Sequence, residues 1–280
     1  SALIATFLYL TGNVDILTFK SHNNLNASTG FFVNRTVFSI FLLFCLISSF
    51  EYLDNSKNFK DDFITFVYVR LFIVFIAIGL ITSFSRTGNF LLLVTLLFYM
   101  INETLFKKEN NKSFRNIILI VIIIDIFIFG IYFGSSRIVD RFSFLENEFE
   151  EIKNIDINFA RFQVIKFALF QIYDYLIFGY GPGSFEALFQ IKFPNLINSY
   201  ANHAHSDLIQ FIGEFGLVGS IIFFLLISSF FLNINHNLKN NLLFSYLLII
   251  LLFDFSLHIP LIQVLFVIFF IFNQKFIKLS

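Results

Sequence analysis

The sequence predicts an all-α membrane protein: a polytopic bundle of about eight transmembrane helices with one long helical loop outside the membrane. Three observations support this fold class. The chain of 280 residues is 57% hydrophobic, and its mean hydropathy is +0.80. Only 14% of its residues are charged, whereas soluble domains carry about a quarter. Apolar runs of about 20 residues, the length that crosses a bilayer, recur along the chain.

The expected membrane spans are the apolar runs near residues 1–12, 36–53, 64–84, 87–105, 114–134, 216–234, 241–257 and 259–273. Between the fifth and sixth runs lies one long mixed segment. We therefore divide the chain into an N-terminal part of the bundle (1–134), an outer loop (135–215) and a C-terminal part of the bundle (216–280). The chain begins without Met or a basic region, so we expect earlier helices to be missing and no signal peptide.

The Lys and Arg residues predict which span ends face the cytoplasm. One set of short links and ends contains Lys57, Lys60, Lys107, Lys108, Lys112, Arg115, Lys239, Lys275 and Lys278, whereas the opposite short links contain only Lys20, Arg35 and Arg86. We expect the richer side to be cytoplasmic, because short loops rich in Lys and Arg stay there. The 135–215 loop and the span ends with Arg35 and Arg86 then face outward, into the periplasm of a Gram-negative cell.

Composition argues against nucleic-acid binding and against a zinc site. The formal net charge is zero and the sequence has no basic stripe, so we expect no nucleic-acid partner. Cys45 is the single cysteine. It cannot form an intrachain disulfide, and no Cys/His spacing indicates zinc. We expect neither a metal nor another cofactor.

The outer loop contains a predicted amphipathic helix. Its apolar face consists of Phe162, Ile165, Leu169, Ile172 and Leu176, and its polar side of Gln163, Lys166, Gln171 and Asp174. Gly179 or Gly181 is expected to end the helix, as C-terminal glycines do. The spacing predicts a helix that lies on or near the outer leaflet of the membrane.

A polar cluster, "ANHAHSD", precedes the sixth span. His205 is a candidate base, because an imidazole with a pKa near its ordinary value exchanges protons close to neutral pH. His203 is its neighbour in an extended chain. Asp207 either orients a histidine or caps the following helix, and we favour the cap. Glu214 lies about two turns further on the same face and either reaches the site or pairs with a loop cation.

Two sets of glycines flank this cluster. Gly179, Gly181 and Gly183 occur in "GYGPGSF", where no strand precedes them, so the pattern fails as a phosphate-binding fingerprint. We expect a rigid turn that places Tyr180 and Phe185 near the lipid or a bound substrate. Gly213, Gly216 and Gly219 are spaced by three, which predicts ordinary helix packing in membranes.

Polar residues inside or near the spans are functional candidates by default. For Asp125, in the middle of the fifth span, function and an interhelical polar pair are equally favoured. Arg70 lies a turn or two inside its helix. Asp254 and His258 are one turn apart near the last pair of spans, and we expect His258 to be structural.

Four stretches of the chain, in this order, resemble a known family. They are "TGFFVNRTVFS", "TSFSRTGNFLLLV", "ARFQVIKFALFQIYDYLIFGYGPGSF" and "HAHSDLIQFIGEFGLVG", and "DFSLHIP" near the C-terminus fits as well. Together they resemble the O-antigen ligase and polymerase superfamily of bacterial membrane glycosyltransferases. Ser206 and Thr36 stand where Asn is usual, and Leu208 where an aromatic residue is usual. These departures bear on the subfamily more than on membership.

The resemblance implies a GT-C-like helical fold and a glycan donor on undecaprenyl pyrophosphate, with no metal requirement. It implies a multi-pass enzyme of the bacterial inner membrane whose active site faces the periplasm. It also implies an essential outer-loop arginine and an essential histidine, which match Arg161 and His205. The acceptor is expected to be a hydroxyl of lipid A-core or of another molecule.

The reaction assigns roles to these residues. The departing pyrophosphate gains negative charge, which arginine stabilises through two-pronged hydrogen bonds. Arg161 is the first choice for this task, with Arg86 and Arg35 as further donor-binding cations, and His205 assists the acceptor hydroxyl. Supporting residues are His203, Asp207, Glu214, Gly181 and Gly183.

Several alternatives stay open. We favour a ligase, and a polysaccharide polymerase is almost as well supported. A protein O-oligosaccharyltransferase of the same superfamily differs mainly in its acceptor. A transporter or flippase would use Asp125, Arg70 and the outer arginines as a pathway, but the polar positions gather mostly at the outer ends of the helices. A protein that binds the lipid-linked glycan without catalysis would tolerate loss of His205.

Overall fold

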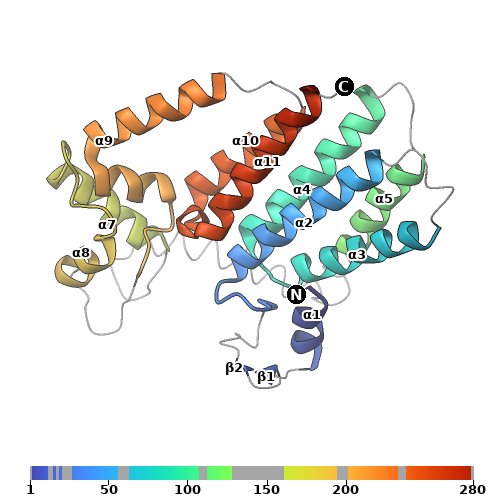
Figure 1. The fold of residues 1–280 in the computed structure, drawn as a ribbon. Helices are drawn as coiled ribbons and strands as arrows, with labels where there is room; N and C mark the ends of the chain where they lie inside the picture. Colours follow the sequence, from blue (N-terminus) through green and yellow to red (C-terminus); the bar gives the residue numbers. More distant parts are fainter. Residues whose placement is uncertain are drawn as a thin grey trace. The chain divides into compact units, whose positions relative to one another are not determined.

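The structure is a computed structural model that describes residues 2–11, 15–16, 19–20, 27–55, 63–106, 112–127, 161–193, 201–232 and 238–278. These residues are almost entirely helical, as predicted (Figure 1). They also include a short antiparallel pair of strands, β1 (Asp15–Ile16) and β2 (Phe19–Lys20), and the turns and loops that connect the helices. The chain forms two compact units, Ser1–Ile138 and Val139–Ser280, which we describe separately.

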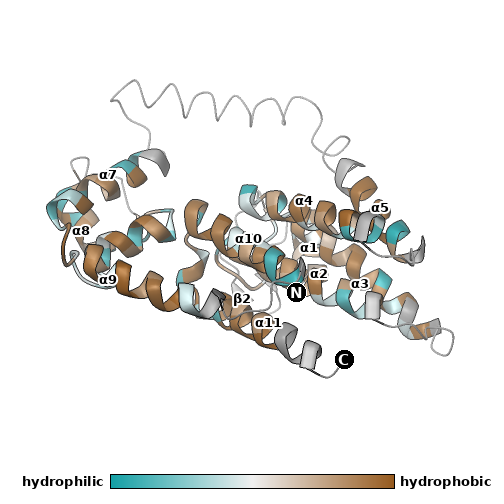
Figure 2. Ribbon diagram, turned by 90° about the horizontal axis from the view of Figure 1, so that it is seen from above, coloured by the Kyte–Doolittle hydropathy of each residue, from teal (hydrophilic) through white to brown (hydrophobic). Residues whose placement is uncertain are grey.

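The N-terminal unit is a bundle of apolar helices. They are α1 (Ala2–Thr11), α2 (Arg35–Asn55), α3 (Phe63–Ile81), α4 (Arg86–Ile101), a π-helical turn η1 (Asn102–Phe106) and α5 (Lys112–Phe127). Each helix from α1 to α5 coincides with one predicted span. Hydrophobic residues predominate along these helices (Figure 2), and large side chains such as Tyr68 and Leu93 are exposed. An apolar surface of this kind is typical of helices in contact with lipid.

Two cross-contacts show that α2 and α4 are parallel neighbours. At their starts, a methyl group added to Gly88 would lie only 2.5 Å from Cβ of Ser39. Toward their ends, the hydroxyl of Tyr99 donates a hydrogen bond of 2.8 Å to Glu51. The two helices therefore begin at the same end of the unit.

The C-terminal unit combines the outer loop with the last helices. It contains α7 (Arg161–Asp174), α8 (Phe185–Lys192), α9 (Asp207–Leu232), α10 (Leu238–Phe253), a single 3-10 turn η3 (Ser256–His258) and α11 (Pro260–Lys278). α7 packs against α9, and η3 packs against α9, α10 and α11. The predicted span at 216–234 begins earlier than expected, because α9 starts at Asp207 and changes direction at Gly216.

Within the part of the chain that the structure describes, two helices are long and apolar enough to cross a membrane, Arg35–Leu53 and Asp207–Ser229. The other apolar stretches are shorter: Ala2–Thr11, Val67–Ile81, Phe114–Ile124, Lys239–Phe253 and Pro260–Ile271. The helices thus confirm the predicted positions of the spans, whereas the number of spans that cross and their orientation stay predictions. Residues 135–160 of the outer loop and the links with Lys57, Lys60, Lys107 and Lys108 lie outside the described residues, as does the side chain of Asp125.

An aromatic core joins α7, α8 and the chain that precedes α9. Its buried members are Val164, Phe167, Ala168, Phe185, Phe189, Phe193, Ala201 and Ala204. The buried face of α7 is therefore not its predicted apolar face, where Leu169 and Leu176 are exposed. That exposed face remains available to lipid, as a helix on the outer leaflet requires. Phe185 is buried in this core and does not face lipid or substrate as expected.

Candidate active site

The candidate site forms where a glycine-rich turn meets a break in α9. Gly216 has φ +66°, a left-handed conformation that interrupts the helix. The amides of Leu217 and Val218 lose their helical partners there and donate to the carbonyls of Leu176 (2.9 Å) and Ile177 (3.2 Å). The residues after α7 thus satisfy the backbone that the break leaves free.

The same turn pairs with the first half of α9. The amide of Tyr180 donates to the carbonyl of Gly213 (2.9 Å), and that of Gly181 to the carbonyl of Glu214 (3.0 Å). These bonds draw the two backbones together, so that a methyl group on Gly179 would lie 2.6 Å from the amide nitrogen of Gly216. The rigid turn predicted from "GYGPGSF" is therefore present, fixed against α9.

Two glycines of α9 allow the turn to approach the helix this closely. A methyl group on Gly213 would lie 2.6 Å from the ring of Tyr180, and one on Gly216 would lie 2.5 Å from the amide nitrogen of Gly179. A methyl group on Gly219 would meet only Phe215 of its own helix. The interpretation as ordinary helix packing is therefore wrong for Gly213 and Gly216, which leave room for the turn, and stays a prediction for Gly219.

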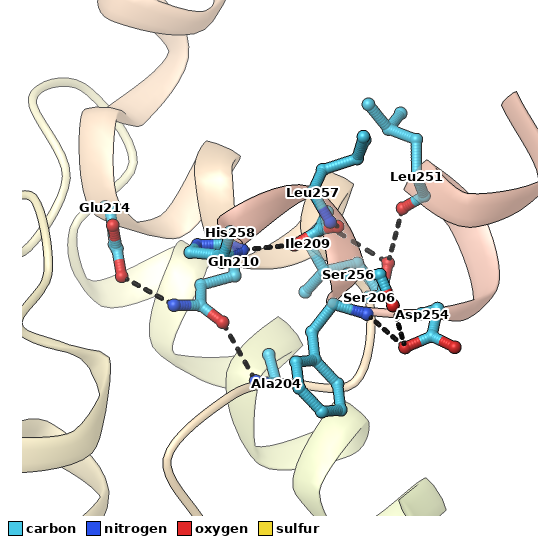
Figure 3. A network of polar contacts seen from close by, with 12 residues as sticks. Ala204, Ser206, Ile209, Gln210, Glu214, Leu251, Asp254, Ser256, Leu257 and His258 are labelled. Carbon is cyan, nitrogen blue, oxygen red and sulfur yellow. Dashed lines mark hydrogen bonds and ion pairs between the residues drawn. The ribbon is translucent and has the colours of Figure 1, made fainter. Parts of the chain in front are cut away.

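Glu214 and Gln210 link this turn to the histidines. The amide of Gly183 donates to one carboxylate oxygen of Glu214 (2.9 Å), and the side-chain amide of Gln210 donates to the other (2.9 Å). The amide of Ala204, which lies between His203 and His205, donates to the side-chain carbonyl of Gln210 (3.0 Å). Glu214 and Gln210 are both buried. Glu214 therefore reaches the site through Gln210 (Figure 3).

The two predicted histidines contact the same aromatic ring, that of Phe255. His203 stacks on Phe255 with ring centroids 4.8 Å apart, and His205 meets the same ring edge-on at 5.5 Å. His205 has φ +58°, a conformation that costs a non-glycine residue free energy and that clusters at functional sites. Phe255, which no sequence pattern indicated, thus positions both imidazoles.

Asp207 orients a histidine and does not cap α9. The cap is Ser206, whose hydroxyl oxygen accepts a bond from the amide of Ile209 (3.4 Å). The carboxylate of Asp207 instead contacts Nδ1 of His258 and accepts a bond from the amide of Leu257 (2.9 Å). The favoured interpretation of Asp207 as a cap is wrong. His258, expected to be structural, is the histidine that Asp207 holds.

His258 belongs to the same polar cluster as the predicted residues. Its ring centroid lies 5.1 Å from that of His203. Asp254, the neighbour suggested by sequence spacing, instead accepts a bond from the amide of Phe255 (2.7 Å), and its own carbonyl accepts one from the amide of Asp207 (2.9 Å). Figure 3 draws His258, Gln210, Asp254 and Ser206 in one network of polar contacts.

Burial and hydrogen bonding shift the pKa values of the cluster in opposite directions. The hydrogen bond to Asp207 raises the pKa of His258, and burial only partly opposes it. Burial lowers the pKa of His203, and the nearby His258 lowers it further. Burial also raises the pKa of Tyr180, with a smaller contribution from the charge of Glu214. The site therefore favours a charged His258 beside a neutral His203.

The predicted arginines all begin helices. Arg35 and Arg86 are the first residues of α2 and α4, and therefore lie at one end of the N-terminal unit. Arg161 is the first residue of α7. Val164, one turn after Arg161, belongs to the same buried core as Ala204. The start of α7 thus lies on the histidine side of the C-terminal unit.

The structure places His203, His205, Asp207, Glu214, Gly181 and Gly183 within one unit, and their functional roles stay predictions. Gly88 was expected to permit a close backbone approach, and the approach it permits is that of Ser39 on a neighbouring helix. Within the described residues, no group of three or more His, Cys, Asp and Glu side chains is arranged to hold a metal ion. That the reaction requires no metal stays a prediction.

The family model of the O-antigen ligases matches residues 71–224, more than half of the chain. The chain belongs to the O-antigen ligase family. No curated protein and no solved structure matches it. Members of the family are integral membrane enzymes that transfer glycans from lipid carriers. The match includes Arg86, Arg161 and His205 but ends before His258.

Proposed function

We propose that this O-antigen ligase family member joins an oligo- or polysaccharide from undecaprenyl pyrophosphate to a hydroxyl of lipid A-core. The observation that carries the proposal is the histidine loop, which Gln210 and Glu214 fix to the glycine-rich turn inside the family match. A buried network of this kind holds reactive side chains in one geometry before the substrates arrive.

On the donor side, Arg161 binds the pyrophosphate, aided by Arg86 and Arg35. Arginine keeps its charge at every working pH and matches phosphate oxygens with two parallel hydrogen bonds. A well-placed donor of this type contributes on the order of 3–4 kcal/mol to transition-state stabilisation. Because fixed cations neutralise the leaving group, we propose that transfer needs no metal ion and continues in the presence of a chelator.

On the acceptor side, His205 contacts the attacking hydroxyl as base or orienting group. The hydroxyl oxygen attacks the anomeric carbon, the bond from that carbon to the pyrophosphate oxygen breaks, and the configuration inverts. The electron pair leaves with the pyrophosphate. We place the site at the periplasmic face of the bacterial inner membrane, because the short loops on the other side carry most of the Lys and Arg residues.

The test is the lipopolysaccharide and glycan gel profile of a strain without the gene, complemented by wild type or by His205→Ala. Loss of capped polysaccharide while long undecaprenyl-linked polymer accumulates identifies a ligase. Caps of one repeat only identify a polymerase, and loss of glycan from protein identifies a protein O-oligosaccharyltransferase. Full rescue by His205→Ala contradicts the role of His205 and favours a carrier of the lipid-linked glycan.

A further inference from the structure

His258 and Asp207 form a carboxylate–imidazole pair at the edge of the described site. One carboxylate oxygen of Asp207 contacts Nδ1 of His258, and the other accepts the amide of Leu257, the residue before it. The carboxylate is thus fixed at both oxygens to the turn that carries the imidazole. The side chain of Asp207 is 5% exposed, whereas that of His258 is 29% exposed. The pair is therefore anchored on its carboxylate side and accessible on its imidazole side.

This contact determines which nitrogen of His258 reacts. A carboxylate is an acceptor only, so it holds the hydrogen of the imidazole on Nδ1. In the neutral ring the lone pair then resides on Nε2, which is the nitrogen that accepts a proton. The same arrangement keeps the base of serine hydrolases in its working tautomer. His203 does not have it, because its Nδ1 is buried with no hydrogen-bond partner among the described residues.

We propose that Nε2 of His258, positioned by Asp207, takes the proton of the acceptor hydroxyl, and that His205 orients that hydroxyl. The inference rests on the proposed function and deepens it. The O–H bond of the acceptor breaks and its proton moves to Nε2. The acceptor oxygen bonds to the anomeric carbon, and the pyrophosphate departs with the electron pair of the bond that breaks. The proton then passes from His258 to water.

The charges around His258 predict the pH dependence of transfer. Asp207 and Glu214 face it from α9, and His203 faces it from the preceding loop. The hydrogen bond to Asp207 raises the pKa of His258 above its ordinary value of 6.5. Because only the neutral ring accepts a proton, the rate rises with pH through an inflection above 6.5. Without the negative charge of Asp207, that inflection moves to lower pH.

The experiment measures kcat, KM and the pH profile of the purified full chain with an undecaprenyl-pyrophosphate-linked glycan and lipid A-core. His258→Asn retains a donor in the place of Nδ1–H and removes Nε2. Asp207→Asn retains the shape of the carboxylate but favours the wrong tautomer. We expect each to lower kcat by roughly 10³–10⁴ with little change in KM. Asp174→Asn, which removes a carboxylate paired with Lys192 on the surface, is the matched control.

Each outcome decides one claim. If wild type transfers no glycan, the proposed function fails and this inference with it. If wild type is active and both variants stay within threefold of it with an unchanged pH profile, the proposed function stands and the inference is overturned. Elution of the variants as folded protein in size-exclusion chromatography excludes simple unfolding. Partial recovery of kcat in Asp207→Glu, which restores the charge, supports the positioning role against a structural one.

Discussion

Two close backbone contacts, one in each unit, differ in what they join. At Gly88 the backbone of α4 meets the side chain of Ser39 on α2, and the amide of Gly88 is bonded to Ser85 at the start of its own helix. At Gly216 a broken helix meets a turn, and the turn supplies carbonyls for amides that the break leaves free. The first contact is packing alone. The second makes the outer loop and α9 depend on each other, which explains why the polar site lies there.

The largest expected effect is that of Gly216→Ala. The new methyl group would lie 2.5 Å from the amide nitrogen of Gly179, and φ +66° is unfavourable for alanine. The conformational strain alone costs about 1–3 kcal/mol, and the clash adds to it. We expect the thermal midpoint of the detergent-purified protein to fall sharply and activity to be lost.

Gly183→Ala is the matched control for this comparison. Its φ is +69°, but no atom lies within 4 Å of the added methyl group. The substitution therefore introduces backbone strain without a steric clash. Gly88→Ala provides the N-terminal counterpart, with a clash but no left-handed backbone. Equal loss of stability in Gly216→Ala and Gly183→Ala would show that the junction with the turn contributes nothing.

The next largest effect concerns the arginines. They begin regular helices, so we expect their charge to matter for activity more than for the stability of the fold. Arg161→Ala should lower kcat/KM by about 10²–10³, as removal of one electrostatic donor does, while the thermal midpoint stays close to that of wild type. Arg161→Lys should recover part of the activity, because lysine lacks the two-pronged geometry. Arg115→Ala, at the opposite predicted face, is the control. A fall in the midpoint equal to that of Gly216→Ala would assign Arg161 a structural role.

Most of the fold was predictable because its determinants are local. An apolar run of sufficient length forms a helix whatever its neighbours are, and each of the predicted spans is indeed a helix. The break at Gly216 was not predicted, since "GEFGLVG" also fits an unbroken helix. Only the carbonyls of Leu176 and Ile177, forty residues earlier in the chain, make the break favourable.

The residues of the candidate site could be identified from the sequence, but the contacts between them could not. The histidines, Asp207 and Glu214 were found because titratable side chains gather where an apolar helix begins. Asp207 was assigned to a cap because its local position suits one, and His258 was expected to be structural. The actual partners, Asp207 and His258, are 51 residues apart. Sequence spacing within one helix carries no information about such a contact.

A smaller effect is expected for Glu214, which joins the turn to the histidine loop. Glu214→Ala removes the acceptor of the buried side-chain amide of Gln210 and of the backbone amide of Gly183, an exposed residue. The buried donor of Gln210, left without a partner, costs about 1–3 kcal/mol, whereas water replaces the lost partner of Gly183. We expect the thermal midpoint to fall and kcat to decrease about tenfold, because the histidines lose one support without losing any reacting atom.

Glu214→Gln separates the hydrogen bond of this side chain with Gly183 from its hydrogen bond with Gln210. Its amide oxygen still accepts the bond from Gly183, but its NH₂ group opposes that of Gln210. The variant should therefore keep most of the stability and show a reduced kcat. In a double-mutant cycle, Gln210→Ala should add little to Glu214→Ala. Fully additive losses would mean that the two side chains act separately.

The smallest effect is expected for Tyr180→Phe, within the glycine-rich turn itself. The hydroxyl of Tyr180 is buried and has no hydrogen-bond partner among the described residues, while its ring fills the space above Gly213. Burial raises the pKa of this hydroxyl, so it stays protonated throughout the working pH range and contributes no charge. Removing it leaves the packing intact and removes a desolvation cost, which predicts unchanged or slightly higher stability, by up to about 1 kcal/mol, and activity within twofold. A tenfold loss of kcat with normal stability would instead place the hydroxyl against the substrate and make the turn part of the reacting surface.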